Sequence, residues 1–537
     1  MTIRFETVCF PGFFRLATKW FWWFISAFIY LFLTLETLSA QSIPVGSVFD
    51  EYIRRKQLNG ELDSTFSFTV RPFNLRTFKA EQFSDSDSLL NFGKSIFESS
   101  VGNSSIIVLP FSWQQLYKGN PTFSRNDGAI IQSKGYQSFI SAGIAAKFGP
   151  LSIQMQPEYV FAVNRKYRDN SPHIGAIDLP LHFGEGTYSK LLLGQSSIRL
   201  NFDPISIGVS NENLWWGPGI QNSILMSNSA PGFSHLTFNT TRPIKTPIGS
   251  VETQIVAGRL ESSGFTGGLP DDWRYFSGVV FSYQPRILPG MFLGFTRSFQ
   301  TYRMDMDNTV GDYLPFFQAF QKINTNEDDK RRDQLTSVFA RWLLTKSKAE
   351  VYFEYGLNDH SYNTRDFLMS PEHSRAFTIG YNKLIPFKGR TDEFIQVGLE
   401  ATLLDQSLDR ILRDSGEWYV HHQVIHGYTN RGQVMGAGIG PGGNLQSMNL
   451  SWVKGLKRIG IQFERYKHNA YFSYVYDYQP WIDFGAAAVG MWDHKRFIFN
   501  AKLQAIQSFN YQWLSGPKGL SNNPLYLNGE LGLMYRF

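Results

Sequence analysis

Cysteine is almost absent from this sequence. The single cysteine, Cys9, lies ahead of the first apolar run, where it is not placed for lipid attachment at a cleavage site. Once the first 40 residues are removed, the chain contains no cysteine at all. Disulfide bonds and thiolate chemistry are therefore excluded as sources of stability or activity in the predicted mature protein.

Long apolar runs are missing beyond residue 40. No later stretch approaches the length of about 18 apolar residues that a membrane-spanning helix needs, so we expect none. The apolar run 20–33 follows three basic residues and precedes Ala40, a small residue suited to cleavage. This pattern predicts a signal peptide over 1–40 and export of the chain. A retained membrane anchor is the alternative, although the run is short for a span.

Charge is also scarce. Charged residues make up 18% of the chain and aromatic residues 16%, with 47 glycines. A helical membrane protein would be more apolar than the mean hydropathy of −0.23, and a soluble enzyme is usually richer in charge. The formal net charge of +6 is spread along the chain without a basic run, so we expect no nucleic-acid partner. The composition favours a large β-barrel.

In place of long apolar runs, the chain has segments in which apolar and polar residues alternate strictly. In the segment 525–537, every second residue from Leu525 to Phe537 is apolar or glycine, and the residues between them are mostly polar. Aromatic residues gather at its end, where a membrane interface would lie. The length and pattern are typical of a tilted strand that crosses a bilayer with one face toward lipid. A strand of a soluble sandwich is the alternative.

Similar segments recur back along the chain and predict about eighteen antiparallel strands. Their connections alternate between short ones, such as 149–150 and 454–457, and mostly long ones, such as 163–192 and 405–443. Outer-membrane barrels have short periplasmic turns and long extracellular loops. We therefore predict an all-β transmembrane barrel over 104–537. Its predicted strands are 104–112, 136–148, 151–162, 193–202, 204–212, 232–241, 250–260, 275–285, 290–300, 334–344, 349–358, 374–384, 393–404, 444–453, 458–467, 481–491, 496–512 and 525–537.

Residues 41–103 have a different pattern. Helical spacing over 47–55, and more weakly over 88–97, predicts two short helices separated by Pro72. The even number of strands puts this segment on the same side of the membrane as Phe537, which is the periplasmic side. We predict a small periplasmic helical segment. A loosely ordered linker is the alternative.

The stretches SNENLWWGPG at 210–219 and SNSAPGF at 227–233 resemble the Wzi family of capsule assembly proteins. Further matches are NDGA at 126–129, QPE at 156–158, GYTNRG at 427–432, GIGPG at 438–442 and NYQW at 510–513. The resemblance covers essentially the whole predicted mature chain, and the order and spacing of the motifs make it specific. It implies an eighteen-stranded barrel in the bacterial outer membrane, in contact with lipid and lipopolysaccharide. It also implies a lectin-like role, in which exported capsular polysaccharide is bound and held at the cell surface.

A glycan binder needs flat apolar faces that stack on sugar rings and planar polar groups that bond to hydroxyls. The predicted outside loops 213–231 and 405–443 offer both. The candidate glycan-binding residues are Asn213, Trp215, Trp216, Trp418, Tyr428 and Arg431. Arg431 can also pair with an acidic sugar in a bidentate way. The alternative for the tryptophans is packing inside a filled barrel or a place in the membrane-interface belt.

Catalysis has little support. His421 and His422 are adjacent, so on a strand they would point to opposite faces and not share a metal ion. The sequence places no histidine beside Ser473 or Ser508, as an outer-membrane hydrolase would need. We therefore predict no enzymatic activity, no cofactor and no metal. A porin or substrate-specific channel is the main alternative to polysaccharide binding, and it predicts an open polar lumen.

Overall fold

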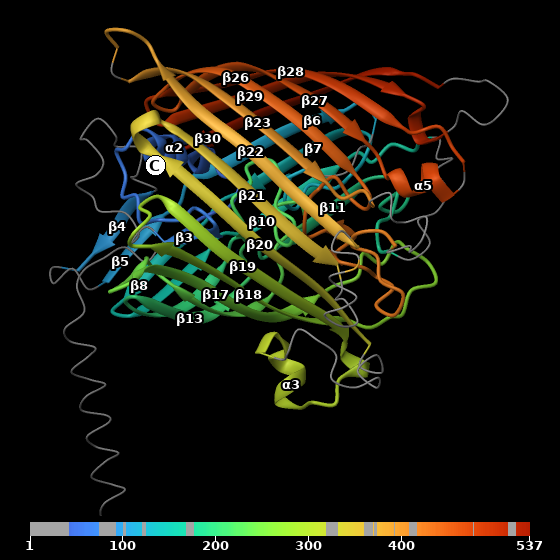
Figure 1. Cartoon of the computed structure of the whole chain (residues 1–537), viewed down its shortest axis with the longest axis horizontal. Helices are drawn as coiled ribbons and strands as arrows, with labels where there is room; N and C mark the ends of the chain where they lie inside the picture. The colour runs from blue at the N-terminus through green and yellow to red at the C-terminus, as the bar shows by residue number, and fades with distance from the viewer. Residues whose placement is uncertain are drawn as a thin grey trace, which may run out of the picture.

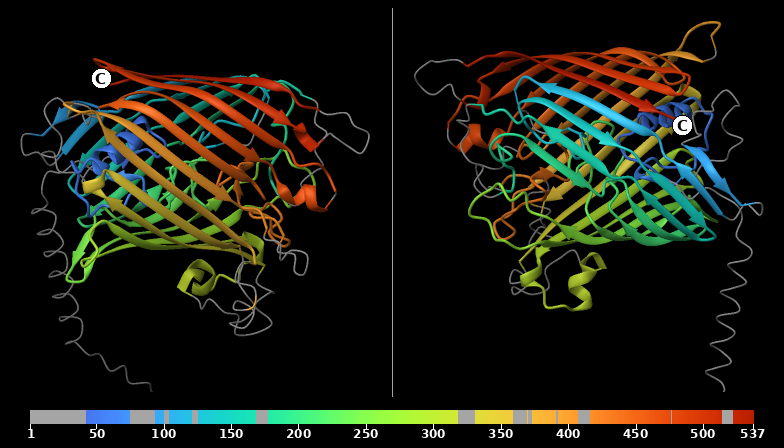
Figure 2. Two further views of the ribbon diagram at one scale, coloured as in Figure 1. Left: turned by 45° about the horizontal axis from the view of Figure 1, so that its top comes forward. Right: turned by 180° about the vertical axis from the view of Figure 1, so that it is seen from behind.

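One antiparallel sheet winds into a barrel and dominates the computed structural model (Figure 1 and Figure 2). The structure describes residues 42–74, 93–99, 104–120, 125–167, 177–317, 331–358, 369, 373–390, 392–406, 416–475, 477–513 and 522–537. The predicted signal peptide lies outside these residues and stays a prediction. None of the helices within these ranges is both long and apolar enough to traverse a bilayer.

The ring closes between its first and last long strands. β30 (Leu525–Tyr535) pairs with β6 (Phe111–Lys118) in antiparallel register. Five spans are each interrupted once, so β5 and β6, β7 and β8, β9 and β10, β11 and β12, and β15 and β16 are halves of single strands. Among the described residues, eighteen strands then form the ring, which confirms the predicted number.

The bounds of the strands in the ring follow the predicted ones to within a few residues for most elements. They are β5 Ser104–Val108, β6 Phe111–Lys118, β7 Gly135–Ser141, β8 Ile144–Phe148, β9 Leu151–Met155, β10 Glu158–Ala162, β11 Tyr188–Leu192, β12 Ser197–Phe202, β13 Ile205–Ser210, β15 His235–Thr240, β17 Gly249–Leu260, β18 Arg274–Pro285, β19 Met291–Tyr302, β20 Arg332–Leu344, β21 Ala349–Asn358, β22 Arg375–Pro386, β23 Glu393–Leu403, β26 Asn444–Lys454, β27 Lys457–Lys467, β28 Ile482–His494, β29 Phe497–Phe509 and β30 Leu525–Tyr535. The short strands β4 Lys94–Glu98 and β16 Ile244–Thr246 belong to the same sheet and pair with β5 and β17. The short elements outside this sheet are β1 Ser42–Ile43, β2 Val70–Arg71, β3 Phe73–Asn74, β14 Trp215–Trp216, β24 Thr429–Asn430, β25 Gln433–Val434, α2 Val48–Leu58, α3 Val310–Tyr313 and α5 Ala470–Val475.

The period-two pattern of the sequence becomes the two faces of the wall. On β20, Val338 and Trp342 point outward and are exposed, whereas Phe339 and Arg341 point into the barrel and are buried. Successive strand residues face opposite sides, so the alternation directs apolar side chains to lipid and many polar ones to the lumen. The wall is therefore that of a membrane-spanning barrel.

The connections sort by length between the two ends of the barrel. Turns such as 149–150 and 495–496 are short, while the connections at the opposite end include 211–234 and 404–443. Figure 1 places α2 and the C-terminus at the end with the short turns. This end is periplasmic by the rule that outer-membrane barrels have short periplasmic turns.

The N-terminal segment enters the lumen from the short-turn end. Its helix α2, expected from the spacing over 47–55, carries Asp50 and Glu51 in the first turn and basic residues in the last, as the helix dipole favours. Arg54 Nε lies 2.7 Å from Glu350 Oε1 of β21, and Glu350 Oε2 also accepts from Arg341 at 2.7 Å. All three side chains are buried, so this charged group fixes α2 inside the barrel.

The second predicted helix, over 88–97, is wrong where the structure describes it. Residues Lys94–Glu98 form β4, which pairs with β5, and residues 88–92 lie outside the described part. The helical spacing there was weak. Pairing with a neighbouring strand, which the sequence pattern does not encode, decides the backbone conformation.

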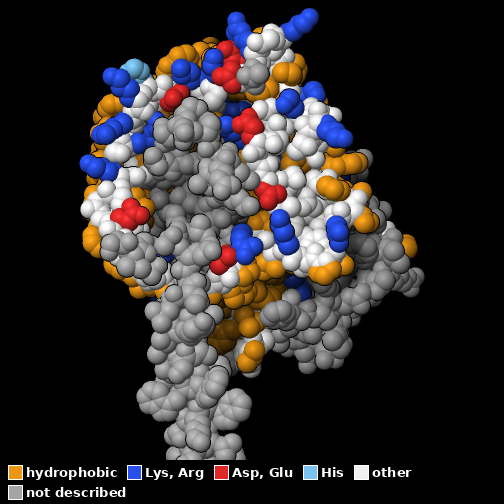
Figure 3. Space-filling view, turned by 90° about the vertical axis from the view of Figure 1, so that its left-hand side faces the viewer, with side chains coloured by type: hydrophobic (Ala, Val, Ile, Leu, Met, Phe, Trp, Pro, Cys, Tyr) orange, Lys and Arg blue, Asp and Glu red, His pale blue; other side chains and the backbone are white. Residues whose placement is uncertain are grey.

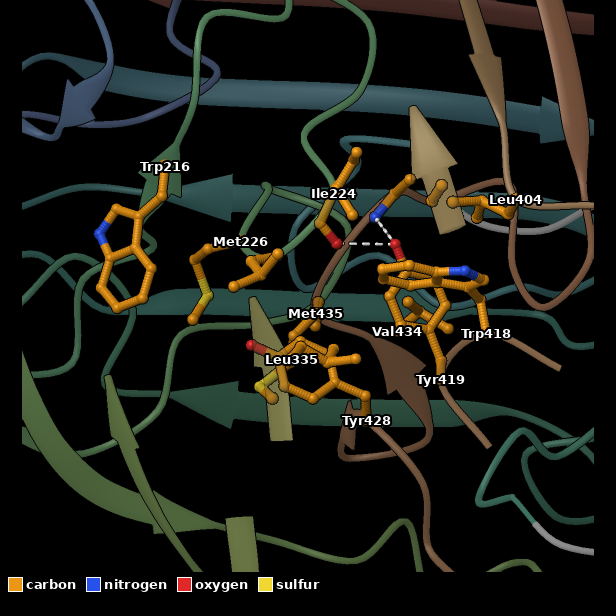
Figure 4. Close-up of a cluster of buried hydrophobic side chains, with 14 of the residues drawn as sticks. Trp216, Ile224, Met226, Leu335, Leu404, Trp418, Tyr419, Tyr428, Val434 and Met435 are labelled. Carbon is orange, nitrogen blue, oxygen red and sulfur yellow. Dashed lines mark hydrogen bonds between the residues drawn. The ribbon is translucent and has the colours of Figure 1, made fainter. Parts of the chain in front are cut away.

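Two long connections fold back into the lumen from the other end. The backbone N–H groups of Ile220, Gln221 and Asn222 donate to the carboxylate of Glu400 on β23, at 2.7–3.1 Å. The second connection, 416–443, packs against the first: Tyr419 donates to the Ile224 carbonyl at 2.8 Å (Figure 4). The lumen is therefore filled with protein and has its own hydrophobic core.

Candidate functional site

A polar cavity of about 300 Å³ lies inside the barrel, between the N-terminal segment and the wall formed by β6, β7, β10 and β30. Its polar lining consists mainly of side-chain amides, and its charged lining residues are acidic. The amides include Gln114, Asn126, Gln156, Gln195, Asn213 and Asn228. A carboxamide carries both a donor and an acceptor group in one plane, which suits it to hydroxyl groups.

Hydrogen bonds link three of these side-chain amides, those of Gln195, Asn213 and Asn228, into a chain that runs from Glu158 to the Asn126 carbonyl. Gln195 Nε2 donates to Glu158 Oε1 at 2.8 Å and to Asn213 Oδ1 at 2.9 Å. Asn213 Nδ2 donates in turn to Asn228 Oδ1 at 2.6 Å. Asn228 Nδ2 then donates to the Asn126 carbonyl at 3.0 Å. Each amide plane is held by its neighbours, so the lining is rigid before any ligand arrives.

The chain of amides joins parts of the sequence that carry the family motifs. Apart from Gln195, its members come from the motif regions 126–129, 156–158, 210–219 and 227–233. Gly194 permits the close approach of two of the spans, because an added Cβ would lie 2.6 Å from the Gln156 carbonyl oxygen and from Glu158 Cγ. Its φ of +57° also favours glycine. The four motifs therefore meet at one place in the fold.

Next to the cavity, Glu212 stays ionised in a buried position. Burial raises the pKa of this carboxyl, but the Arg199 guanidinium, 2.6 Å away, outweighs burial and holds the pKa below its usual value. Ser210 donates a hydrogen bond to the same carboxylate at 2.8 Å, and Ser42 donates another. This charge therefore ties the N-terminal segment to the start of the inward-folding 211–234 connection.

Five of the six candidate glycan-binding residues are buried in the lumen. Asn213 lies on the cavity, while the exposed fractions of Trp215, Trp216, Trp418 and Tyr428 are all 3% or less. Their rings present no open face on which a sugar could stack while the inward-folding segments keep this conformation. Direct stacking on these rings stays a prediction.

The two adjacent tryptophans connect the two ends of the lumen. Trp215–Trp216 forms β14, which pairs with β2 of the N-terminal segment, and the Arg71 guanidinium lies 4.4 Å from the centre of the Trp215 ring. Trp216 Nε1 donates to Gln254 Oε1 at 2.8 Å. This geometry favours the alternative of internal packing, because segments from opposite ends of the barrel are joined here.

Trp418 and Tyr428 belong to the hydrophobic core of the lumen, which Figure 4 shows together with Trp216. Trp418 Nε1 donates to the Arg375 carbonyl at 3.0 Å, and the Tyr428 hydroxyl donates to Ser298 Oγ at 2.9 Å. Arg431 differs from the other candidates because it is only half-buried, and its guanidinium makes no hydrogen bond to another described residue. It therefore keeps donors available for an acidic group.

The sequence did not single out Gln114, Gln156, Glu158 or Gln195 as site residues. Gln156 and Glu158 stood in a family motif, so the resemblance could have pointed to them. Gln114 and Gln195 carry no such signal. They lie on or beside strands that come together only when the barrel closes.

The structure brings Ser508 near a histidine, which the sequence did not predict. Ser508 Oγ donates to Asp483 Oδ1 at 2.5 Å, and His468 Nε2 lies 2.8 Å from Asp483 Oδ2. Asp483 therefore lies between Ser508 and His468, whereas a hydrolase needs the serine hydrogen-bonded to the histidine. Among the described residues, no group of His, Cys, Asp and Glu is arranged to hold a metal ion.

The model of the family described as capsule assembly protein Wzi matches residues 112–483, which is more than half of the chain. The chain belongs to this family. The solved structure of Wzi from Escherichia coli, described as an outer membrane protein involved in group 1 capsule assembly and as a carbohydrate-binding β-barrel, matches with a TM-score of 0.62. That match has 13% identity and covers 93% of this chain and 100% of the other, so it establishes the Wzi fold here.

Two channel structures match less well. A BenF-like porin from Pseudomonas fluorescens has a TM-score of 0.39 and 9% identity, and covers 81% of this chain and 98% of its own. OccAB3 of Acinetobacter baumannii has a TM-score of 0.39 and 10% identity, and covers 81% and 99%. No curated protein sequence matches the chain.

Proposed function

We propose that this Wzi family member is an outer-membrane protein that binds capsular polysaccharide and helps to assemble or anchor it at the cell surface. Membership of the family supports this function, and so does the shared fold with a relative described as carbohydrate-binding. The observation that carries the proposal is the chain of hydrogen-bonded amides at which four family motifs meet.

The cavity is the proposed glycan site. Its volume of about 300 Å³ is at the lower end of ligand pockets, so it would take a chain end or a side branch rather than a whole polymer strand. The lining includes Asp127, Glu158 and Glu530 but no lysine or arginine. Neutral or amino sugars would therefore suit it better than uronic acids. An acidic sugar of the polymer would instead pair with the guanidinium of Arg431.

Gln114 offers a clean test of this site. It lines the cavity from β6, and its side-chain amide makes no hydrogen bond to another described residue, so replacing it leaves the amide chain intact. We expect Gln114→Leu to weaken binding of the purified protein to its capsular polymer by about fivefold, as the loss of one hydrogen bond predicts. Isothermal calorimetry with oligosaccharides cut from the polymer measures the change.

Gln115→Leu is the matched control. Gln115 is the next residue on the same strand and lines the outer, lipid-facing side of the wall. Binding should keep its wild-type strength in this variant. Equal affinity of the Gln114→Leu and wild-type proteins would contradict the cavity as the glycan site while leaving the family function untouched.

A porin is the competing function, and planar-bilayer recording separates the two. The filled lumen supports a protein without a large steady pore, so we expect no stable conductance of porin size. A large steady current would contradict the proposal. We propose no catalytic step, because Ser508 bonds to Asp483 rather than to a base. Turnover of a lipid or glycan that is lost in Ser508→Ala would overturn this.

A further inference from the structure

A membrane-facing groove of about 400 Å³ crosses the outside of the barrel over β6 and β27 to β30. Gly490 of β28 and Ala501 of β29 leave space at its floor. A Cβ added to Gly490 would meet no heavy atom closer than 4.0 Å, so the floor opens toward lipid. The outward side chains that flank the floor are Trp113, Ile459, Trp492, Phe499 and Leu531.

Three basic residues lie at the short-turn end of the strands beside this groove, one at the start of β27 and two in a turn. Lys457 Nζ lies 4.7 Å from the centre of the Trp492 ring, and Lys495 and Arg496 form the turn between β28 and β29. Figure 3, which looks at this end of the barrel, shows Lys and Arg side chains spread around its rim. The groove therefore ends in a cluster of positive charge.

No acidic residue in the described ranges neutralises these three cations, in contrast to some of the others on the rim. Elsewhere Arg242 pairs with Asp203 at 2.9 Å, and Lys454 pairs with Glu393 at 2.9 Å. Lys457, Lys495 and Arg496 make no ion pair with another residue in the described ranges. Their charge is available to an anion held at the level of the lipid headgroups.

We propose that the groove and these cations form a binding site for one anionic phospholipid. An acyl chain fills the groove over Gly490, and the phosphate is held by Lys457 and Arg496. Tryptophans take positions at the membrane interface, so Trp492 marks the depth at which the headgroup lies. The short turns are periplasmic, which puts the site in the leaflet that consists of phospholipid rather than lipopolysaccharide.

Native mass spectrometry of the full protein released from detergent tests this site, with phosphatidylglycerol and the zwitterionic phosphatidylcholine as probes. The wild-type protein should retain one phosphatidylglycerol and much less phosphatidylcholine. In the triple variant Lys457→Ala, Lys495→Ala, Arg496→Ala, we expect retention of phosphatidylglycerol to fall about tenfold. The matched control is Lys245→Ala, Arg286→Ala, Lys346→Ala, which removes the same charge from exposed residues at the same end of the barrel on a distant part of the ring.

Filling the groove tests the acyl-chain half of the proposal. Gly490→Leu adds a side chain where the structure has open space, so the strand pairing should survive, and a retained heat-modifiable gel shift reports the folded barrel. We expect phosphatidylglycerol retention to fall about tenfold here too, with all cations present. The proposed site would be overturned if both triple variants lost phosphatidylglycerol equally, or if Gly490→Leu retained it at the wild-type level. Preferential binding of lipid A would overturn it as well.

Discussion

The wall of this barrel and the contents of its lumen are held together in different ways. The wall is a regular ladder in which Trp342 faces lipid and is 45% exposed, whereas Trp216 in the lumen is fully buried. The lumen has its own hydrophobic core and buried ion pairs, like the interior of a soluble domain. An open porin would leave inward polar residues such as Glu350 and Glu400 to water. Here those residues bond to inserted segments, so the wall acts as a scaffold for a second interior.

The largest loss of stability is expected from breaking the buried ion pairs that join the wall to the segments inside the lumen. Glu350→Ala removes the partner of both Arg54 and Arg341 and leaves two buried guanidinium groups without their carboxylate. Breaking such a buried pair costs about 3–5 kcal/mol, so the N-terminal segment should lose its anchor. Hydrogen exchange of the α2 amides measures the loss. Wild-type protection of α2 in this variant would show that packing alone holds the helix.

A pair of tryptophan truncations compares the two regions directly. Trp216→Ala leaves a cavity between the inward-folding segment and β18, where Gly278 contacts the ring, and should cost about 3 kcal/mol of the stability of the lumen. Trp342→Ala should cost clearly less, because lipid fills the space outside. Thermal unfolding in detergent gives both values. Similar losses would mean that lumen and wall unfold as one unit.

Asp50 should favour the packing of the N-terminal segment more strongly in acid, whereas Glu51 of the same helix, whose pKa Arg458 and Arg55 hold below its usual value, acts in the opposite direction. Burial raises the pKa of Asp50 from 3.8 to about 6, against the lowering effect of Arg71 3.5 Å away. The folded-state pKa is raised, so this contribution is complete below pH 3.8 and is lost as the pH rises through about 6. The contribution of Asp50 to the protection of α2 from hydrogen exchange should fall by about 2 kcal/mol across this window, and the difference between the wild type and an Asp50 variant measures it.

Asp50→Asn tests the source of this pH dependence. The amide keeps an oxygen for the Gly46 N–H, which donates to Asp50 Oδ2 at 2.9 Å in the wild type. The variant should lose the dependence between pH 4 and 6 and should be the better protected protein at pH 7. An unchanged slope would assign the effect to another group.

The smallest effect is expected at the exposed ion pair between Lys166 and Glu185. Its nitrogen and oxygen are 2.6 Å apart, yet the two side chains are 71% and 83% exposed. Solvent screens exposed pairs, so Lys166→Ala should leave the midpoint of thermal unfolding unchanged. A loss near that of Glu350→Ala would show that burial does not separate the two regions as described.

The wall could be predicted from the sequence because its signal is local. The alternation over 525–537 and the lengths of the connections sufficed to give eighteen strands and the sidedness of the loops. The helix α2 was also visible in its spacing. The weak helical pattern over 88–97 failed, because strand pairing overrode it at Lys94–Glu98.

The lumen could not be predicted in the same way. The segment 213–231 was expected outside the barrel, and its tryptophans left open whether they bind a sugar or pack inside a filled barrel. The sequence does not distinguish a sugar-binding Trp215 from one that packs in a core, because both roles need a large apolar ring. Gln114 and Gln195 could not be identified as site residues, because neither glutamine belongs to a sequence motif.

By itself, the sequence determined the barrel, its number of strands and the family to which the chain belongs. These properties follow from a period-two pattern and from motifs that are continuous in the chain. Only the tertiary structure decided that the lumen is filled and that Asn126, Glu158, Asn213 and Asn228 surround one cavity. The physical reason is that closure of the ring and the inward folding of loops bring together residues far apart in sequence, and no local pattern records those contacts.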